Sequence, residues 1–359
     1  MRDPFAPYQL AGVTLRNRFV RSATVSPYAA DGVITQAGIQ RYRLLARNQV
    51  GLIITEMTYV CPQGKASHTQ LSLCSEEDTV HHSQITKAVH QEGGKIFLQL
   101  NHGGAASLSE HPLSPSGISS PYTNLATQAM TEADIADVTQ KFAASAAWAK
   151  EAGYDGIQIH CAHGYLLSQF ISPYFNRRKD AYGGTPEKRF RFPAEVISAV
   201  RAAVGSAYPV CIKINSNAEL EQDDGAYEDA LMWMGQRCAE LGICAIEVSG
   251  HDFTLQGRAG HHTYYLKRAA RLHASSGLPV MLVGGIRTME HVQQVLGAGI
   301  DLISMSRPFL CQPDSILCLK QGLPLLCTSC SKCFIMLRKF KAEGRLCVIH
   351  EQGADVSVG

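Results

Sequence analysis

The feature that most constrains the fold is an alternation of two patterns along the chain. Short β-branched runs of strand length alternate with longer segments of helical spacing, about eight times over. The expected strands are Phe19–Thr24, Leu52–Thr55, Lys95–Leu100, Gly156–His160, Val210–Ile214, Ala245–Ser249, Val280–Val283 and Leu302–Met305. Segments such as Thr131–Ala152 and Pro186–Val204 are long enough for the helices that connect parallel strands. Eight such units predict a closed (β/α)8 barrel, a TIM barrel, over residues 1–326.

A doubly wound sheet is the alternative, but it would carry a glycine-rich dinucleotide turn after its first strand, and the sequence has none there. Several expected strands end in polar residues or glycines, namely Glu56, Gln99 with His102, His160 with His163, Lys213 with Asn215, and Gly284 with Gly285. In a barrel these are the carboxyl ends of the strands, where active sites are assembled. The longest irregular stretch, Gly103–Met130, is expected to be an active-site loop after the third strand.

The charge balance argues against two classes of partner. The 33 basic and 31 acidic residues nearly cancel, so no general attraction to nucleic acid or to an anionic membrane is expected. The longest apolar stretches are far shorter than the ~20 residues of a membrane helix. The N-terminus also lacks the pattern of a secretory signal. We therefore expect a cytoplasmic protein in which most of the 12 cysteines are free thiols.

The densest chemical signal is a group of two imidazoles and a phenol at one expected strand end. His160, His163 and Tyr165 together can hold a carbonyl oxygen or a small anion and deliver a proton. A metal pair is a second interpretation, although no carboxylate stands near it and two histidines do not complete a metal site. Two unrelated core or surface histidines are a third. The position at the barrel rim favours the first interpretation.

A second signal lies after the last two expected strands. Gly284 and Gly285 follow the seventh strand, and Ser306 and Arg307 follow the eighth. Small residues after these two strands let backbone N–H groups approach phosphate oxygens, and an arginine adds a forked donor. The alternative is a plain tight turn beside a surface arginine. The two loops at matched positions favour a phosphate site.

The third signal is a set of four cysteines in the short extension of residues 327–359, which we expect to pack on the barrel. Cys327, Cys330 and Cys333 are separated by two residues each, and Cys347 follows after thirteen more. This spacing suits a cubane [4Fe-4S] cluster. Zinc binding or four unliganded thiols are the alternatives.

The chain resembles the old yellow enzyme family of FMN-dependent NADH:flavin oxidoreductases over nearly its whole length. The matching stretches are Asn17–Thr24, Gly51–Glu56, Leu98–Gly104, His160–Tyr165, Ser168–Pro173 and Asn176–Gly184. The resemblance implies a TIM barrel that binds FMN and takes hydride from NAD(P)H. It also implies a homo-oligomer.

The resemblance implies a role for each matching residue. Ala23, Thr24 and Met57 would line the flavin, and Gln99 would hydrogen-bond to its pyrimidine edge. Lys213 would lie near the electron-rich edge of the flavin. The phosphate would be bound by Gly284, Gly285, Ser306 and Arg307. His160 and His163 would hold the substrate's carbonyl oxygen, and Tyr165 would protonate the substrate carbon. Three residues depart from the family pattern. Val25 stands where many relatives have Thr or Cys, Ala105 where an arginine is common, and Lys213 where arginine is usual.

The leading hypothesis is an FMN-dependent ene-reductase that acts on a small-molecule α,β-unsaturated carbonyl compound, with enoyl or dienoyl thioesters as candidates. The cysteine arrangement is similar to that of 2,4-dienoyl-CoA reductase and trimethylamine dehydrogenase, which carry a cluster and further domains. A second hypothesis is therefore amine or C–H oxidation, with electrons leaving through the cluster to an external partner. A third is a flavin-binding carrier, which would have no use for Tyr165 as a proton donor.

Overall fold

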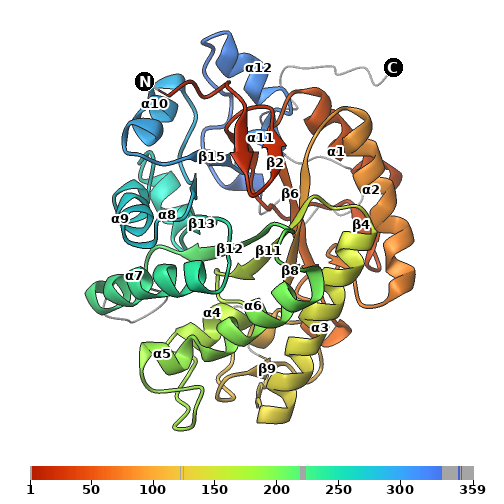
Figure 1. The fold of residues 1–359 in the computed structure, drawn as a ribbon, viewed down its shortest axis with the longest axis vertical. Coiled ribbons are helices and arrows are strands. Elements are labelled where there is room, and N and C mark those ends of the chain that lie inside the picture. The colour runs from red at the N-terminus through yellow and green to blue at the C-terminus, as the bar shows by residue number, and fades with distance from the viewer. Residues whose placement is uncertain are drawn as a thin grey trace.

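The computed structural model describes residues 2–121, 123, 125–218, 224–333, 347 and 349, drawn as a ribbon in Figure 1. Within these residues, eight parallel strands form a closed ring. In ring order they are β3 (Phe19–Arg21), β6 (Leu52–Tyr59), β8 (Ile96–Asn101), β11 (Gly156–Cys161), β12 (Val210–Asn215), β13 (Ile246–Ser249), β14 (Val280–Val283) and β15 (Leu302–Met305). Ser304 of the last strand pairs with Val20 of the first, which closes the ring. The predicted (β/α)8 barrel is confirmed.

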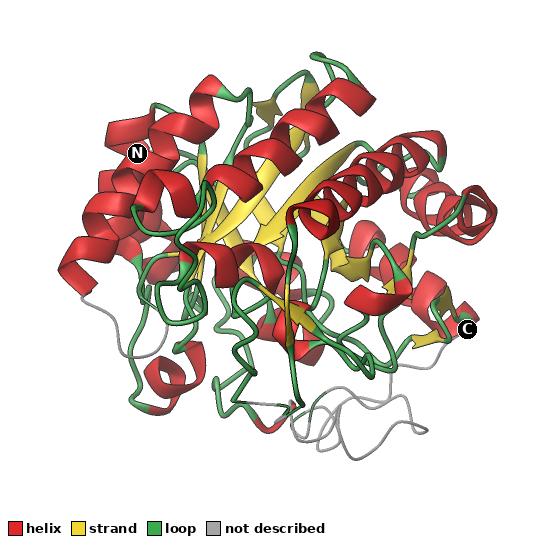
Figure 2. Cartoon of the chain, turned by 90° about the horizontal axis from the view of Figure 1, so that it is seen from below, coloured by secondary structure: helices red, strands yellow, loops and turns green. Residues whose placement is uncertain are grey.

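Helices cover the outside of the strand ring, as the view from below shows (Figure 2). The longer ones are α1 (Gln36–Arg47), α2 (Thr79–Gln91), α3 (Glu132–Glu151), α6 (Arg191–Val204), α7 (Asp224–Glu240), α9 (Leu266–Ser276) and α10 (Met289–Gly297). The expected helix Pro186–Val204 is broken at Phe190 into α5 (Pro186–Arg189) and α6. Pro193 accounts for the break because it has no amide hydrogen to donate to the carbonyl of Arg189.

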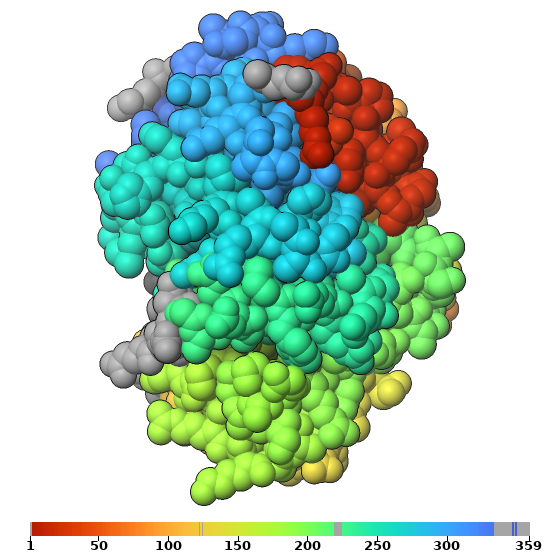
Figure 3. Space-filling view, turned by 60° about the vertical axis from the view of Figure 1, so that its left-hand side comes forward, coloured from red at the N-terminus to blue at the C-terminus, as the bar shows by residue number. Residues whose placement is uncertain are grey.

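An N-terminal hairpin, which the sequence pattern did not predict, packs on one end of the barrel. β1 (Tyr8–Leu10) and β2 (Val13–Leu15) pair antiparallel. Leu10 and Leu15 are almost fully buried in one cluster with residues of the barrel strands. In Figure 3 this segment, in red, lies beside the C-terminal part of the chain, in blue. Strands of three residues are too short to show periodicity, so sequence reasoning missed them.

Two layers of side chains fill the inside of the ring. The lower layer is apolar and contains Val20, Leu52, Ile54, Phe97, Cys211, Ala245, Met281 and Leu302. Side chains two positions apart on a strand point to the same face. The residues two positions further along five of these strands are polar and buried, and they are Ser22, Gln99, Lys213, Glu247 and Ser304. The barrel interior therefore changes from apolar to polar toward the carboxyl ends of its strands.

Strand β6 departs from this alternation. Its pairing with β8 shifts register between Ile54 and Met57, which marks a β-bulge. The bulge turns the face of the strand, so Met57 rather than Glu56 follows Ile54 on the inner side. Glu56 instead contacts Tyr42 of helix α1 on the outer side. Glu56 therefore lies within β6, which continues to Tyr59, and its carboxylate contacts helix α1.

The long stretch Gly103–Met130 follows β8, as expected. It carries a short 3-10 turn (Gly104–Ala106) and two strands, β9 (Leu113–Ser114) and β10 (Gln128–Ala129), which pair in parallel.

Among the residues that the structure describes, no helix combines the length and the apolar character that crossing a membrane requires.

Candidate active site

The two histidines and the tyrosine come together where strand β11 ends. His160 lies in the strand, and His163 and Gly164 both have left-handed backbone angles, with φ of +62° and +73°. These two residues turn the chain back before Tyr165, which precedes helix α4 (Leu166–Ile171). The ring centroid of His160 lies 5.1 Å from that of His163 and 5.2 Å from that of Tyr165. The cluster predicted from sequence is thus one compact group of rings.

Burial keeps both histidines neutral. Desolvation, with the nearby charges of His163 and Lys213, lowers the pKa of His160 well below 6.5. Desolvation and Lys213 do the same to the pKa of His163. Nε2 of His163 lies 2.9 Å from the Ser249 hydroxyl, whereas Nδ1 of His160 is buried and contacts no hydrogen-bonding group of the described chain. A neutral imidazole offers one N–H donor, which suits a carbonyl oxygen or an anionic oxygen.

Buried neutral histidines predict that stability falls on mild acidification. The pKa values of His82, His102 and His160 are lowered mainly by desolvation, that of His102 to about 3. Below the unfolded pKa of about 6.5, the unfolded chain binds protons that the folded chain does not, so each group lowers the unfolding free energy by up to about 1.4 kcal/mol per pH unit. The unfolding free energy should therefore keep its full value above about pH 6.5 and decline toward pH 5.

Urea unfolding at closely spaced pH values between about 7.5 and 5 measures this dependence. In the matched variant His102→Asn, the unfolding free energy should depend less steeply on pH, because one buried histidine no longer titrates. The fold should persist, because asparagine can still accept the hydrogen bond that Gly104 N donates to His102 Nδ1. An unfolding free energy that stays constant over this range would contradict the prediction.

Gln99 and Lys213 belong to one hydrogen-bonded network in the polar layer. Gln99 Nε2 donates to Gln158 Oε1 (2.7 Å), and Gln158 Nε2 donates to Glu247 Oε2 (3.0 Å). Lys213 Nζ lies 3.3 Å from Glu247 Oε2 and donates to the Ser22 hydroxyl (2.9 Å). Gln158 and Glu247 were not singled out from the sequence. The available signal was a polar side chain within each of two otherwise apolar strands.

The loop after β3 is joined to the loop after β15. The Thr24 and Ser306 hydroxyls lie 2.8 Å apart, and Ala23 precedes Thr24 at the same rim. Met57 Sδ accepts a hydrogen bond from Asn101 Nδ2 (3.6 Å). Of the residues predicted to line a flavin, Ala23 and Thr24 follow β3, and Met57 lies near the carboxyl end of β6.

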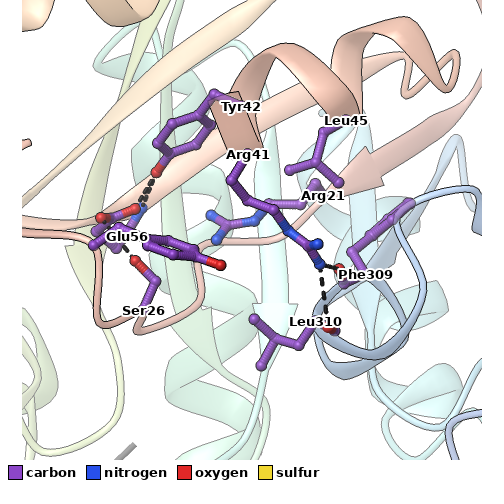
Figure 4. Close-up of a pocket in the computed structure, with 9 residues that line it drawn as sticks. Arg21, Ser26, Arg41, Tyr42, Leu45, Glu56, Phe309 and Leu310 are labelled. Atoms are coloured by element: carbon purple, nitrogen blue, oxygen red, sulfur yellow. Dashed lines mark hydrogen bonds between the residues drawn. The ribbon is translucent and has the colours of Figure 1, made fainter. Parts of the chain in front are cut away.

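Behind the β3 loop is a small pocket between the barrel and helix α1 (Figure 4). Glu56 accepts hydrogen bonds from the hydroxyls of Tyr42 and Ser26. Arg21 donates to the carbonyls of Ile54 and Thr24, while Arg41 donates to those of Phe309 and Leu310 in helix α11 (Arg307–Cys311). The two arginines thus anchor the Thr24 loop and the second half of α11.

The glycine turn after β14 lies against Tyr264, which in turn contacts the buried Arg307. Gly284 and Gly285 have φ of +139° and +72°, which few side chains tolerate. A Cβ on Gly285 would lie 2.5 Å from Cε1 of Tyr264. Nη2 of Arg307 lies 3.4 Å from the Tyr264 hydroxyl. Because Arg307 is only 8% exposed, the alternative of a surface arginine beside a plain turn is wrong.

Arg307 also contacts the cysteine segment, which we define as residues 327–333. Its Nη1 donates to the Ser329 carbonyl (3.2 Å) and to the Ser331 hydroxyl (3.0 Å). Both serines have left-handed backbone angles, with φ of +60° and +61°. The guanidinium therefore joins the glycine turn's neighbour, Tyr264, to the cysteine segment.

The cysteines of the C-terminal part are near enough for their charges to affect one another. Cys327 and Cys347 are buried in one cluster with Cys311, which sequence reasoning had left among the ordinary thiols. Cys333 packs against Leu310, and burial together with the nearby Cys327, Cys347 and Cys330 raises the pKa of its thiol to about 11. Among the described residues, no three Cys, His, Asp or Glu side chains are arranged to hold a metal ion. Most of residues 334–359 lie outside the described residues, so the predicted extension and its [4Fe-4S] cluster stay predictions.

Two of the three departures from the family pattern have a structural setting. Ala105 is fully buried, and its N–H donates to Gln169 Oε1 (3.1 Å), so a long side chain has no room there. Lys213 is buried against Glu247 and Ser22. Nothing in the structure explains Val25.

Comparison with known proteins identifies relatives over most of the chain. The model of the NADH:flavin oxidoreductase / NADH oxidase family matches residues 3–325. The NADPH dehydrogenase of Geobacillus sp. (strain WCH70) is 34% identical over 313 residues, which cover 86% of this chain and 91% of that protein. The NADH oxidase of Thermoanaerobacter brockii is 31% identical over 344 residues, which cover 92% of this chain. Since they cover only 52% of that relative, the chain spans about half its length.

Two solved structures share the fold. Morphinone reductase superposes with a TM-score of 0.79 at 24% identity, covering 90% of each chain. A 2-naphthoyl-CoA reductase complex superposes with a TM-score of 0.80 at 22% identity, covering 89% of this chain and 52% of the other.

Proposed function

The chain belongs to the NADH:flavin oxidoreductase / NADH oxidase family of FMN-dependent oxidoreductases, and from that membership we propose that it is an ene-reductase. It would transfer hydride from NAD(P)H, through FMN, to the carbon–carbon double bond of an α,β-unsaturated carbonyl compound. The observation that carries this proposal is the compact group of His160, His163 and Tyr165, because a substrate carbonyl needs hydrogen-bond donors and the adjacent carbon needs a proton.

The residues around the rim fit FMN. Tyr264 lies against the left-handed turn at Gly285 and contacts the buried Arg307, and a glycine turn together with a guanidinium suits a phosphate group. Gln99 and Lys213 offer polar groups to the pyrimidine end of the flavin, with Ala23, Thr24 and Met57 beside them. When bound, FMN would accept hydride from NAD(P)H and donate hydride to the alkene.

The protein's own groups bind and polarise the substrate. Neutral His160 and His163 would donate N–H groups to the carbonyl oxygen, which draws electron density from the double bond and makes the β-carbon electrophilic. The Tyr165 hydroxyl would give its proton to the α-carbon as hydride reaches the β-carbon. Because both imidazoles are already neutral in a buried site, they stay hydrogen-bond donors across the physiological pH range.

Anaerobic mixing experiments on the FMN-loaded protein test this function. NADH or NADPH should bleach the flavin absorbance, and an α,β-unsaturated ketone added next should restore it with formation of the saturated ketone. The saturated ketone itself is the matched control and should restore nothing. Acyl thioesters with a conjugated double bond extend the same assay to the thioester candidates. Bleaching by an amine but not by a nicotinamide would instead support amine oxidation.

The visible spectrum of the anaerobically purified protein tests the cluster in the same preparation. We propose Cys327, Cys330, Cys333 and Cys347 as its ligands, in keeping with their spacing. Broad absorbance added to the flavin bands would support a [4Fe-4S] cluster and an external electron partner. A spectrum of FMN alone would leave these residues as thiols or zinc ligands.

A further inference from the structure

A buried carboxylate below the site plays no part in the mechanism above. Glu247 of strand β13 has no exposed surface. Its Oε2 accepts from Gln158 Nε2 (3.0 Å) and lies 3.3 Å from Lys213 Nζ, and its Oε1 accepts from the Ser304 hydroxyl. Lys213 and Glu247 are register partners on adjacent strands. Burying a charge costs free energy unless the charge is paired and hydrogen-bonded. The partners of Glu247 meet both conditions, so the carboxylate can stay charged inside the barrel.

Glu247 determines the direction of the hydrogen bonds through Gln158 and Gln99. A carboxylate only accepts, so Gln158 must turn its Nε2 toward Glu247 and its Oε1 away. Gln158 Oε1 then needs a donor, and Gln99 Nε2 supplies it at 2.7 Å. The amide of Gln99 is thereby left with its carbonyl oxygen as the end that can face a ligand. An acceptor at that place suits the ring N–H of a flavin's pyrimidine edge.

Glu247 also balances the charge of Lys213. The ammonium is buried between this carboxylate and the Ser22 hydroxyl, and both of its partners lie within the polar layer. An unbalanced ammonium beside the cofactor would favour its electron-rich forms more strongly than an ion pair does.

We propose that Glu247 is a positioning residue of the flavin site, which holds Lys213 and the Gln158–Gln99 pair in fixed directions and moderates the electron affinity of the bound FMN. The proposal rests on the FMN site of the proposed function but not on the identity of the alkene substrate.

Sulfite is a direct probe, because it adds to oxidised flavins more tightly as their electron affinity rises. We would measure its dissociation constant, together with the FMN reduction potential, on wild-type and Glu247→Gln holoenzymes at about pH 6. Because the charge of the Lys213 ammonium is no longer balanced, the variant should bind sulfite at least about tenfold more tightly. A tenfold change corresponds to about 1.36 kcal/mol. Its reduction potential should rise as well.

Ser304→Ala is the matched control, because it removes one hydrogen bond to Glu247 and leaves the charges in place. Its sulfite affinity should stay close to that of the wild type. If Glu247→Gln fails to hold FMN, Glu247→Asp should hold it, because that variant keeps the carboxylate that balances Lys213. A folded Glu247→Gln holoenzyme with wild-type sulfite affinity, or a folded Glu247→Asp variant that also fails to hold FMN, overturns the proposal.

These results separate this inference from the function on which it rests. A wild-type protein that holds FMN but reduces no alkene refutes the ene-reductase, and the sulfite comparison still decides the role of Glu247. A wild-type protein that holds no FMN refutes both.

Discussion

Replacing Tyr165 by phenylalanine should slow alkene reduction by roughly 10²–10⁴-fold, the usual contribution of a general acid. Reduction of the flavin by NAD(P)H should stay close to the wild-type rate, because that half-reaction transfers no proton to a carbon. Phenylalanine keeps the ring that packs 5.2 Å from His160, so the group of rings should persist.

Stopped-flow measurement of the two half-reactions separates these effects. Tyr8→Phe is the matched control, because Tyr8 lies in strand β1 of the hairpin, at the end of the barrel opposite the site. Both of its half-reactions should match those of the wild type. Equal slowing of both halves in Tyr165→Phe would contradict the assignment of Tyr165 as proton donor.

Replacing Arg307 by methionine should weaken FMN binding by roughly 10- to 150-fold. This range follows from the ~1.5–3 kcal/mol that a hydrogen bond to a charged group contributes. The FMN affinity of Arg307→Lys should lie between those of the wild type and Arg307→Met, because an ammonium keeps the charge and loses the forked pair of donors. Methionine also breaks the contacts to Ser329 and Ser331.

Fluorescence titration of the apoprotein with FMN gives these dissociation constants. Arg258→Met serves as the control, because Arg258 is exposed at the end of helix α8 (Phe253–Arg258) and should not affect FMN binding. An unchanged dissociation constant in Arg307→Met would refute the phosphate role of the guanidinium.

The sequence predicts the barrel well because the strands are short, mostly apolar segments that alternate with longer segments of helical spacing. Strands β14 and β15 begin and end where the pattern places them. The pattern fails where a single backbone event changes it. A bulge between Ile54 and Met57 cannot be read from hydrophobicity, and neither can the break that Pro193 causes.

Rim residues are predictable because parallel strands bring their carboxyl ends together, whatever the details of packing. His160, His163 and Tyr165 are examples. Partners from the inside of the barrel are harder, because they depend on strand register. Glu247 meets Lys213 through the pairing of β12 with β13, and a one-residue slip would separate them. Tyr264 lies against Gly285 through a loop contact that no periodic pattern records.

The shared contacts of Arg307 have a thermodynamic consequence. One guanidinium holds the cysteine segment through Ser329 and Ser331, and the same group is the expected phosphate donor. Two ligands that bias one element are linked, and each changes the affinity of the other by the same factor. A ligand that binds the cysteines and moves this segment should therefore alter the affinity for FMN, and FMN should alter the affinity for that ligand by the same factor.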